Sequence, residues 1–225
     1  MDPLAGSPWS AATTVAGFAR SLPNEVLMRS AEVALTRCAG GRLLDIGSGA
    51  ARNALPLAQL GWDVLGLDLS WPMLSAALDR ARGVKCAGHL QFALAPMERL
   101  PVRDHCIDFV VAHGIWNLAP SATIFRRAVA EAARVAKPGA SLFVFTFSRN
   151  TLPAEAHPVA NEPFVYTQFS GQPQCFLTEE ELVAELDCAG FAPEGPITEY
   201  NRRSPSDLAA ATGPVIYEGM FRRRA

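Results

Sequence analysis

The sequence lacks any apolar run that approaches the ~20 residues needed to span a bilayer. Its longest apolar stretches, around Val64–Leu69 and Leu142–Phe147, have the length of strands. The first residues, Met1-Asp2-Pro3, do not open a basic and then apolar segment of the kind that directs secretion. We therefore expect a cytoplasmic protein that has no membrane partner.

Basic residues and paired cysteines are also scarce. Twenty Lys and Arg against 22 Asp and Glu leave a net charge of −2, whereas a domain that holds nucleic acid through its charge usually has a clear basic excess. The five cysteines form no Cys-x-x-Cys pair, which favours reduced thiols and no metal site. A thiol cluster around a soft metal, assembled only by the fold, stays open. The cysteines are Cys38, Cys86, Cys106, Cys175 and Cys188.

What the chain does have is a core and a regular alternation of elements. Its 225 residues are 49% hydrophobic, which suits one globular domain. After Gly40-Gly41, short apolar strands alternate with helices of 10–15 residues, a pattern typical of a doubly wound, mostly parallel α/β sheet. We predict seven strands with helices on both faces and a late antiparallel strand. The expected strands are 42–46, 62–67, 90–94, 106–112, 141–147, 197–201 and 215–222, and the main expected helices are 52–60, 71–82, 121–135 and 179–189.

The two ends of the chain and one internal segment depart from this alternation. Residues 1–40 are rich in Ala, Val, Leu and Met and are predicted to form a helical cap, so that the main domain covers 41–225. Residues 149–177 have no clear period and are long for a plain connection, which indicates a substrate-side insertion or lid. Lys137-Pro138-Gly139 is expected to end the preceding helix.

The feature richest in chemistry is the segment from Leu43 to Ala51. Gly47 and Gly49 let the backbone turn sharply and approach a ligand, and the helix that follows directs its free N–H groups to the same point. A nicotinamide fingerprint requires a third glycine, where this chain has Arg52. Asp45 at the strand tip would repel a pyrophosphate but suits an ammonium or sulfonium group.

Asp68 follows Asp45 by 23 residues and ends the next predicted strand. In a doubly wound sheet a carboxylate at this position meets the ribose of a bound nucleoside and accepts from both hydroxyls. The two acids together therefore indicate a nucleoside ligand that carries a positive charge.

Several motifs in order make the pattern specific. In these motifs the sequence resembles the class I S-adenosylmethionine-dependent methyltransferases, particularly their small-molecule branch with an N-terminal helical cap. The resemblance covers about residues 40–147 closely and the rest loosely. The motifs are Asp45-x-Gly47-x-Gly49, Gly66–Ser70 followed by Met73-Leu74, Leu100-Pro101, Ile107–Val111 and Val135–Gly139.

The resemblance implies S-adenosyl-L-methionine as cofactor and assigns residues to it. The adenine amino group, often met by an acid in this branch, faces Pro96 here, so Met97 or Glu98 would have to substitute. The residues that the resemblance places around the cofactor are Asp45, Gly47, Ser48, Gly49, Asp68, Leu69, Met73, Met97, Glu98, Ala112 and His113.

The resemblance also places the end of the 106–112 strand beside the transferable methyl group. His113 lies there and is either a general base, for which an ordinary pKa near 6.5 is suitable, or a contact to the cofactor or the strand end. Arg52 could reach the substrate or an acid of the site, and Trp116 is either a packing wall or a substrate-stacking ring. Further candidates for the acceptor pocket are Trp9, Phe18 and Arg20 in the cap and His157, Tyr166 and Cys175 in the insertion.

These residues favour methyl transfer from S-adenosylmethionine to a small-molecule nucleophile, with O, N, S or a metalloid as the acceptor atom. Two alternatives stay open. One is an NAD(P)-dependent oxidoreductase on a similar sheet, against which the missing third glycine counts. The other is a non-catalytic module that binds S-adenosylmethionine. The acceptor and the oligomeric state do not follow from the sequence.

Overall fold

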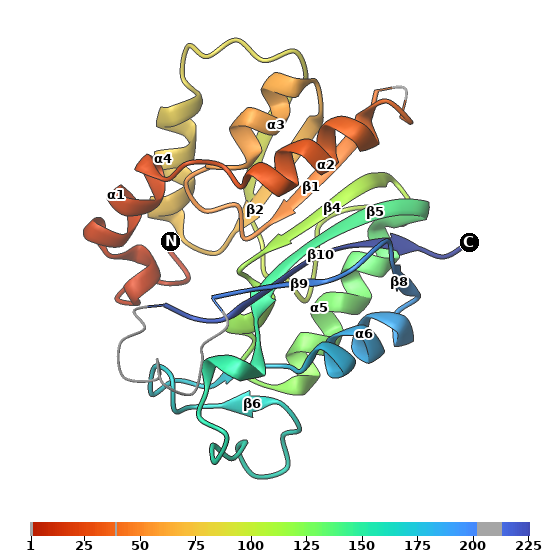
Figure 1. The fold of residues 1–225 in the computed structure, drawn as a ribbon. Helices are drawn as coiled ribbons and strands as arrows, with labels where there is room; N and C mark the ends of the chain where they lie inside the picture. Colours follow the sequence, from red (N-terminus) through yellow and green to blue (C-terminus); the bar gives the residue numbers. More distant parts are fainter. Residues whose placement is uncertain (1, 39, 202–212) are drawn as a thin grey trace.

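The computed structural model describes residues 2–38, 40–201 and 213–225, which form a central sheet with helices on both faces (Figure 1). Within these residues the sheet has eight strands in the order β3-β2-β1-β4-β5-β10-β8, with β9 paired to β10. The strands are β1 (Arg42–Ile46), β2 (Asp63–Asp68), β3 (Leu90–Leu94), β4 (Ile107–His113), β5 (Ala136–Phe147), β8 (Phe191–Pro193), β9 (Thr198–Tyr200) and β10 (Ile216–Arg223).

The helices form two layers. Leu27 of α2 and Leu57 of α3 are fully buried in a core on one face, while Phe125 of α5 and Leu186 of α6 are fully buried in a core on the other. Figure 1 shows the same arrangement, with α5 and α6 on the side of the sheet away from α2 and α3. The α-helices are α1 (Ala12–Arg20), α2 (Glu25–Leu35), α3 (Ala54–Leu60), α4 (Trp71–Ala81), α5 (Ala122–Val135) and α6 (Glu179–Cys188), and the short 3-10 turns are η1 (Pro8–Ser10), η2 (Trp116–Leu118) and η3 (Arg149–Thr151).

The pairing of β1 positions a ligand site. β1 is parallel to both β2 and β4, so the chain leaves the centre of the sheet in opposite directions after β1 and after β4. Ligands of open α/β sheets bind outside the carboxyl ends of the strands at such a switch point. The tips of β1, β2 and β4, which carry the residues selected from the sequence, therefore meet at one edge.

The predicted fold class is confirmed, with differences in the later strands. β5 to β10, β10 to β8 and β10 to β9 are antiparallel pairs, so the sheet has eight strands rather than seven and three of them lie on its antiparallel side. β8 follows Gly190 directly and has three residues, which is too short for a clear alternation of polar and apolar positions.

The helix ends before Lys137-Pro138-Gly139 as predicted, but these residues continue at once as a strand. α5 ends at Val135, and these three residues belong to β5. Ile107 pairs with Ala136 and Phe109 with Ser141, so β5 has extra residues opposite β4 and forms a bulge there. A bulge uses the same positive φ as a turn, which Gly139 supplies at +78°.

Part of the 149–177 segment is built into the core. It contains a two-stranded hairpin of β6 (Val165–Tyr166) and β7 (Gln174–Cys175). Phe164, Val165 and Leu177 are almost completely buried against the α5 side of the sheet. Among the described residues, no helix has the length and apolar character required to cross a membrane.

Candidate functional site

The loop between β1 and α3 is a tight turn held by backbone hydrogen bonds. Gly47 has φ +72° and Gly49 has φ +52°, values that glycine adopts without strain. The N–H groups of Gly47 and Ser48 donate to the carbonyl of Leu67 at 2.7 and 2.8 Å, which ties the loop to β2. A Cβ on Gly47 would lie 2.8 Å from Ile115, so the turn also requires glycine for space.

Asp68 links this loop to the start of the next helix. Its Oδ2 accepts from the Gly49 N–H at 2.9 Å and its Oδ1 accepts from the Ser70 N–H at 2.8 Å. Burial raises the pKa of Asp68, while these backbone donors act to lower it. Each carboxylate oxygen has a second lone pair, so the group can still accept from two hydroxyls. Ser70 is the N-cap of α4, as predicted, and accepts from the Met73 N–H.

Two buried polar atoms at the tip of β1 have no hydrogen-bond partner in the described structure. They are Asp45 Oδ1, on a residue that is 1% exposed, and Ser48 Oγ. Burial raises the pKa of Asp45 to about 7, with the Arg52 charge acting to lower it and Asp68 to raise it further. Buried polar groups without partners are rare and mark a place where a ligand or ordered water completes the hydrogen bonding.

His113 and Arg52 meet beside this turn. Arg52 Nη2 lies 2.9 Å from His113 Nδ1 and 3.2 Å from Nε2, and the His113 ring stacks on Phe145 at 4.1 Å between centroids. Burial, together with the Arg52 charge, lowers the pKa of His113 to about 3. The imidazole is therefore neutral throughout the physiological pH range.

A polar cluster that the sequence analysis missed lies on the other side of His113. Asn24 Nδ2 donates to Glu218 Oε2 at 2.7 Å and lies 3.4 Å from His113 Nε2. The Asn24 N–H donates to Asn53 Oδ1 at 3.0 Å, and its own Oδ1 caps α2. Tyr200 O–H donates to Glu218 Oε1 at 2.9 Å. One asparagine thus joins the N-terminal helices to β4, β10 and the start of α3.

Strand register explains why these groups face one another. Phe145 of β5 is the partner of His113 on β4 and of Glu218 on β10, so the three residues form a row across the sheet. Residues that are direct partners point to the same face of the sheet. Glu218, 4% exposed, is an acid within the otherwise apolar run 215–221, and this signal could have identified it from the sequence.

The N-terminal segment lies against the glycine turn. Phe18 is the nearest side chain to the position of a Cβ on Gly49, at 3.7 Å, and its ring lies under the Arg52 guanidinium at 6.0 Å. Trp9 packs on Phe18 with its carbonyl near the Ser70 hydroxyl at 3.3 Å. Trp9 and Phe18 are therefore next to the predicted site, whereas exposed Arg20 bonds to its own helix.

The other residues predicted to surround the cofactor differ in how accessible their side chains are. Leu69 and Met97 are half-buried, Glu98 is also partly accessible, and Met73 is 3% exposed with its sulfur near the Gly49 turn. Ala112 is 1% exposed and its side chain belongs to the core on the α5 side, so only its backbone can face the carboxyl edge.

Several aromatic and thiol candidates lie in the core or on the outer surface. Trp116 is 1% exposed and packs edge-to-face on Phe125, which is the arrangement of a packing wall. Cys175 is fully buried, and burial raises its pKa to about 12, so its thiol stays protonated. Tyr166 accepts from Arg149, and His157 is exposed on the insertion.

The part of the chain that contains the glycine turn and the two acids is similar to known proteins. A family model described as a methyltransferase domain matches residues 44–144. The chain is 33% identical over 166 residues to the ubiquinone/menaquinone biosynthesis C-methyltransferase UbiE of Acidiphilium cryptum, a match that covers 66% of this chain and 65% of that protein.

Residues 44–144 thus carry the methyltransferase domain that the motifs predict, of the class I S-adenosylmethionine-dependent kind. The chain is also 28% identical over 172 residues to the demethylmenaquinone methyltransferase of Corynebacterium urealyticum, covering 69% of this chain and 70% of that one. The aligned part thus spans about two thirds of these relatives.

Solved structures share the fold of this chain. A SAM-dependent methyltransferase from Methanosarcina mazei matches with a TM-score of 0.69 at 21% identity, over 85% of this chain and 97% of that one. The 1,6-didemethyltoxoflavin-N1-methyltransferase of Burkholderia thailandensis matches with a TM-score of 0.63 at 20% identity, over 90% and 80%.

The carboxyl-edge residues fit S-adenosylmethionine, the cofactor of this family. The unpartnered Asp45 oxygen suits the cationic end of that molecule, and the remaining lone pairs of Asp68 suit its ribose hydroxyls. Ser48 Oγ supplies a further unpartnered polar atom at the turn. When bound, the cofactor supplies an activated methyl group.

Proposed function

We propose that this protein transfers a methyl group from S-adenosylmethionine to a small-molecule nucleophile. The observation that carries the proposal is the pair of acids at adjacent strand tips around the glycine turn. Asp45 has an unpartnered buried oxygen, and Asp68 is held ready by two backbone donors. The relatives described as methyltransferases support the reaction type.

In this proposal the protein positions the reactants and excludes water from them. Positioning and desolvation can supply much of the rate enhancement of such a transfer. Efficient general bases have a pKa near the working pH, whereas that of His113 is about 3. His113 therefore serves as a neutral contact held between Arg52 and Phe145.

The acceptor side is formed by the row His113, Phe145 and Glu218 together with Asn24. This row combines a flat aromatic surface with a buried carboxylate, which suits a small molecule with both a ring and a polar group. The toxoflavin-type relative, crystallised with a small-molecule acceptor and S-adenosylhomocysteine, supports that class. The net charge of −2 supports the absence of a nucleic-acid partner, and the five free thiols support a cytoplasmic location.

Cofactor binding can be tested with two acids on one strand. Asp68→Ala should weaken the affinity for S-adenosylhomocysteine in calorimetry at least tenfold, because a charge-assisted hydrogen bond contributes about 1.5–3 kcal/mol. Asp63→Ala is the matched control, since Asp63 begins β2 at the opposite edge and accepts from the His89 N–H. Equal affinities of both variants and the parent protein would refute the cofactor site.

A second function has one observation in its favour. The [4+2]-cyclase SpnF shares the fold over 100% of this chain and 91% of its own, with a TM-score of 0.67 at 19% identity. A chain with this fold can therefore catalyse a reaction other than methyl transfer. Incubation with methyl-labelled S-adenosylmethionine and pools of phenols, amines, thiols and enols separates the two cases, because only a methyltransferase labels an acceptor.

A further inference from the structure

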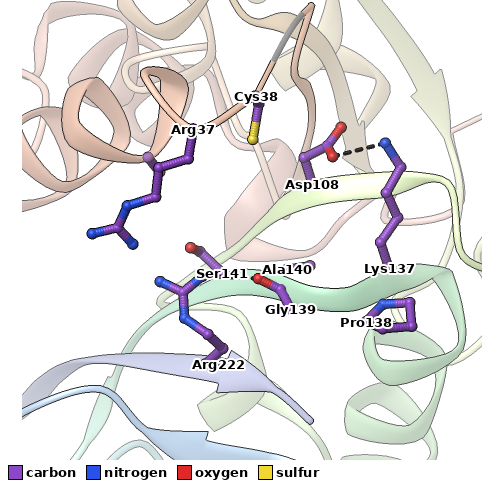
Figure 2. Close-up of a pocket in the computed structure, with 10 residues that line it drawn as sticks. Arg37, Cys38, Asp108, Lys137, Pro138, Gly139, Ala140, Ser141 and Arg222 are labelled. Carbon is purple, nitrogen blue, oxygen red and sulfur yellow. Dashed lines mark hydrogen bonds and ion pairs between the residues drawn. The ribbon is translucent and has the colours of Figure 1, made fainter. Parts of the chain in front are cut away.

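A cavity of about 200 Å³ lies at the edge of the sheet opposite the glycine turn (Figure 2). The end of α2, the starts of β4 and β5 and the end of β10 form its walls. Clefts for drug-sized ligands measure roughly 300–1,000 Å³, so this cavity suits a smaller molecule. It lies at the amino ends of the parallel strands and is therefore separate from the methyl-transfer site.

Three of the four charged residues that line this cavity are cationic. Arg37, Lys137 and Arg222 line it, with Asp108 as the acid among the lining residues. Figure 2 shows the Arg37 and Arg222 side chains on one side of the cavity and the Asp108–Lys137 pair on the other. The two sides therefore differ in charge.

Asp108 does not repel an anion from the cavity, because its carboxylate is already paired with a cation and a backbone donor. Its Oδ1 accepts from Lys137 Nζ at 2.7 Å and its Oδ2 from the Arg42 N–H at 3.0 Å. This side of the cavity is close to neutral, which leaves the two arginines to determine the ligand.

The two arginines share one carboxylate. Glu194 Oε1 accepts from Arg222 and lies 3.4 Å from Arg37 Nη1, while Arg222 Nη1 donates to the Gly139 carbonyl at 2.8 Å. Two guanidinium groups against one carboxylate leave a positive charge. Buried Ser141 adds a polar residue to the wall of the cavity.

We propose that this cavity binds a small oxyanion, a phosphate or carboxylate group, between Arg37 and Arg222. The fork of a guanidinium matches both groups with paired hydrogen bonds. The ligand would join the end of α2 to β10. These are the same two elements that Asn24 and Glu218 join at the opposite edge.

The test measures the melting temperature of the full chain with inorganic phosphate or succinate, against NaCl at equal ionic strength. At ten times the dissociation constant, the parent protein should melt about 3–6 °C higher. Arg37→Gln and Arg222→Gln should weaken the affinity at least tenfold. Arg29→Gln is the matched control, since Arg29 lies on α2 away from the cavity and pairs with Glu25.

Two further variants make the result decisive. Glu194→Gln removes the competing carboxylate and should strengthen anion affinity severalfold, which a merely structural ion pair does not predict. Asp68→Ala should retain the phosphate response even though it loses cofactor affinity, which separates this site from the proposed function. Absence of any shift above NaCl, or equal shifts in Arg29→Gln, Arg37→Gln and Arg222→Gln, would overturn the proposal. A response to only one of the two anions identifies the ligand class.

Discussion

A carboxylate buried as deeply as Asp45 is unfavourable unless a cation or a proton meets it. Arg52 is near, yet the pKa of Asp45 stays about 7, well above the ordinary 3.8. The raised value means that the folded protein favours the protonated acid. A cationic ligand would favour the ionised one, so at this residue stability and binding have opposite pH dependences.

The stability effect has a definite sign. Because the folded pKa lies above the unfolded one, the contribution of Asp45 is favourable below pH 3.8 and is lost as the pH rises to about 7. Asp45→Asn should remove that loss and raise the free energy of unfolding at pH 8 by on the order of 4 kcal/mol. Urea titrations at pH 5 and pH 8 measure it, and an equal change at both values would contradict the expectation.

The affinity of the protein for a cationic ligand at Asp45 should change with pH in the opposite direction to its stability. Calorimetry with S-adenosylmethionine should show affinity rising by up to tenfold per pH unit below pH 7 and levelling off above it. Asp45→Asn should bind more weakly and without this pH dependence. A parent protein whose affinity is constant from pH 6 to pH 8 would contradict a cationic contact at Asp45.

His113 gives a prediction of the opposite kind, the absence of a titration. With a pKa of about 3, it should contribute no ionisation to the rate of methyl transfer between pH 5 and 8. His113→Phe keeps the stack on Phe145 and removes the nitrogens near Arg52. It should lower kcat/KM with the pH profile unchanged. If kcat/KM of the parent protein changed with an apparent pKa near 6.5, and His113→Phe abolished that change, His113 would instead be assigned as a base.

At the scale of elements, the β1–α3 turn requires glycine for two reasons, a positive φ and a lack of space for a side chain. Gly47 and Gly83 share a φ of +72°, but a Cβ on Gly47 would lie 2.8 Å from Ile115, whereas one on Gly83 meets nothing within 4 Å. The pair therefore distinguishes backbone strain from loss of space.

Alanine substitutions at these two positions should differ. Gly83→Ala should cost about 1–2 kcal/mol, the strain of a left-handed alanine. Gly47→Ala should cost about 1–3 kcal/mol more, because Ile115 or the turn must move. Chemical denaturation measures both, and equal costs would show that the turn accommodates a methyl group.

The start of α2 is the second informative element. Asn24→Ala removes a helix cap, worth about 0.5–2 kcal/mol, and a donor to buried Glu218, worth about 1–3 kcal/mol. Thr178→Ala removes a cap at α6 without such a partner and should cost about 1 kcal/mol. Asn24→Ser retains a capping oxygen, so its cost isolates the contact to Glu218. Equal losses for Asn24→Ala and Thr178→Ala would refute the linking role.

Local signals predicted the elements well. The strand Arg42–Ile46 has its predicted bounds, and the Thr178–Glu181 capping box is present as predicted. Both depend on neighbours in the sequence. The strand predicted at 141–147 began too late, because the residues of Lys137–Gly139 suit a turn as well as a bulge. Glu218 was missed because its partners, Asn24 and Tyr200, lie outside its own strand. The Asp45 and Asp68 positions could be predicted since parallel strands bring their carboxyl ends together.

At the scale of the whole molecule, the N-terminal segment is the least anchored part near the site. α1 has no buried residue, whereas α5 has seven. Segments with few buried apolar contacts open first in the native state. Phe18 of α1 nevertheless lies against the glycine turn, so ligand at the turn should affect this helix.

Hydrogen exchange should report that effect. Without ligand, amides of residues 12–20 should exchange far faster than those of 122–135. S-adenosylhomocysteine should slow exchange in 12–20 and leave 122–135 unchanged. Exchange in 12–20 that is insensitive to saturating ligand would show that this helix does not respond to the site.

The bond between Asn24 and Glu218 joins positions that are 194 residues apart along the chain. During synthesis Asn24 emerges early, while Glu218 is added after almost every other element of the sheet. A nascent chain can therefore form the glycine turn and bury β1 before the ribosome has made the acid that meets Asn24. The proposed acceptor side of the site is thus completed last, and an incomplete chain cannot display it.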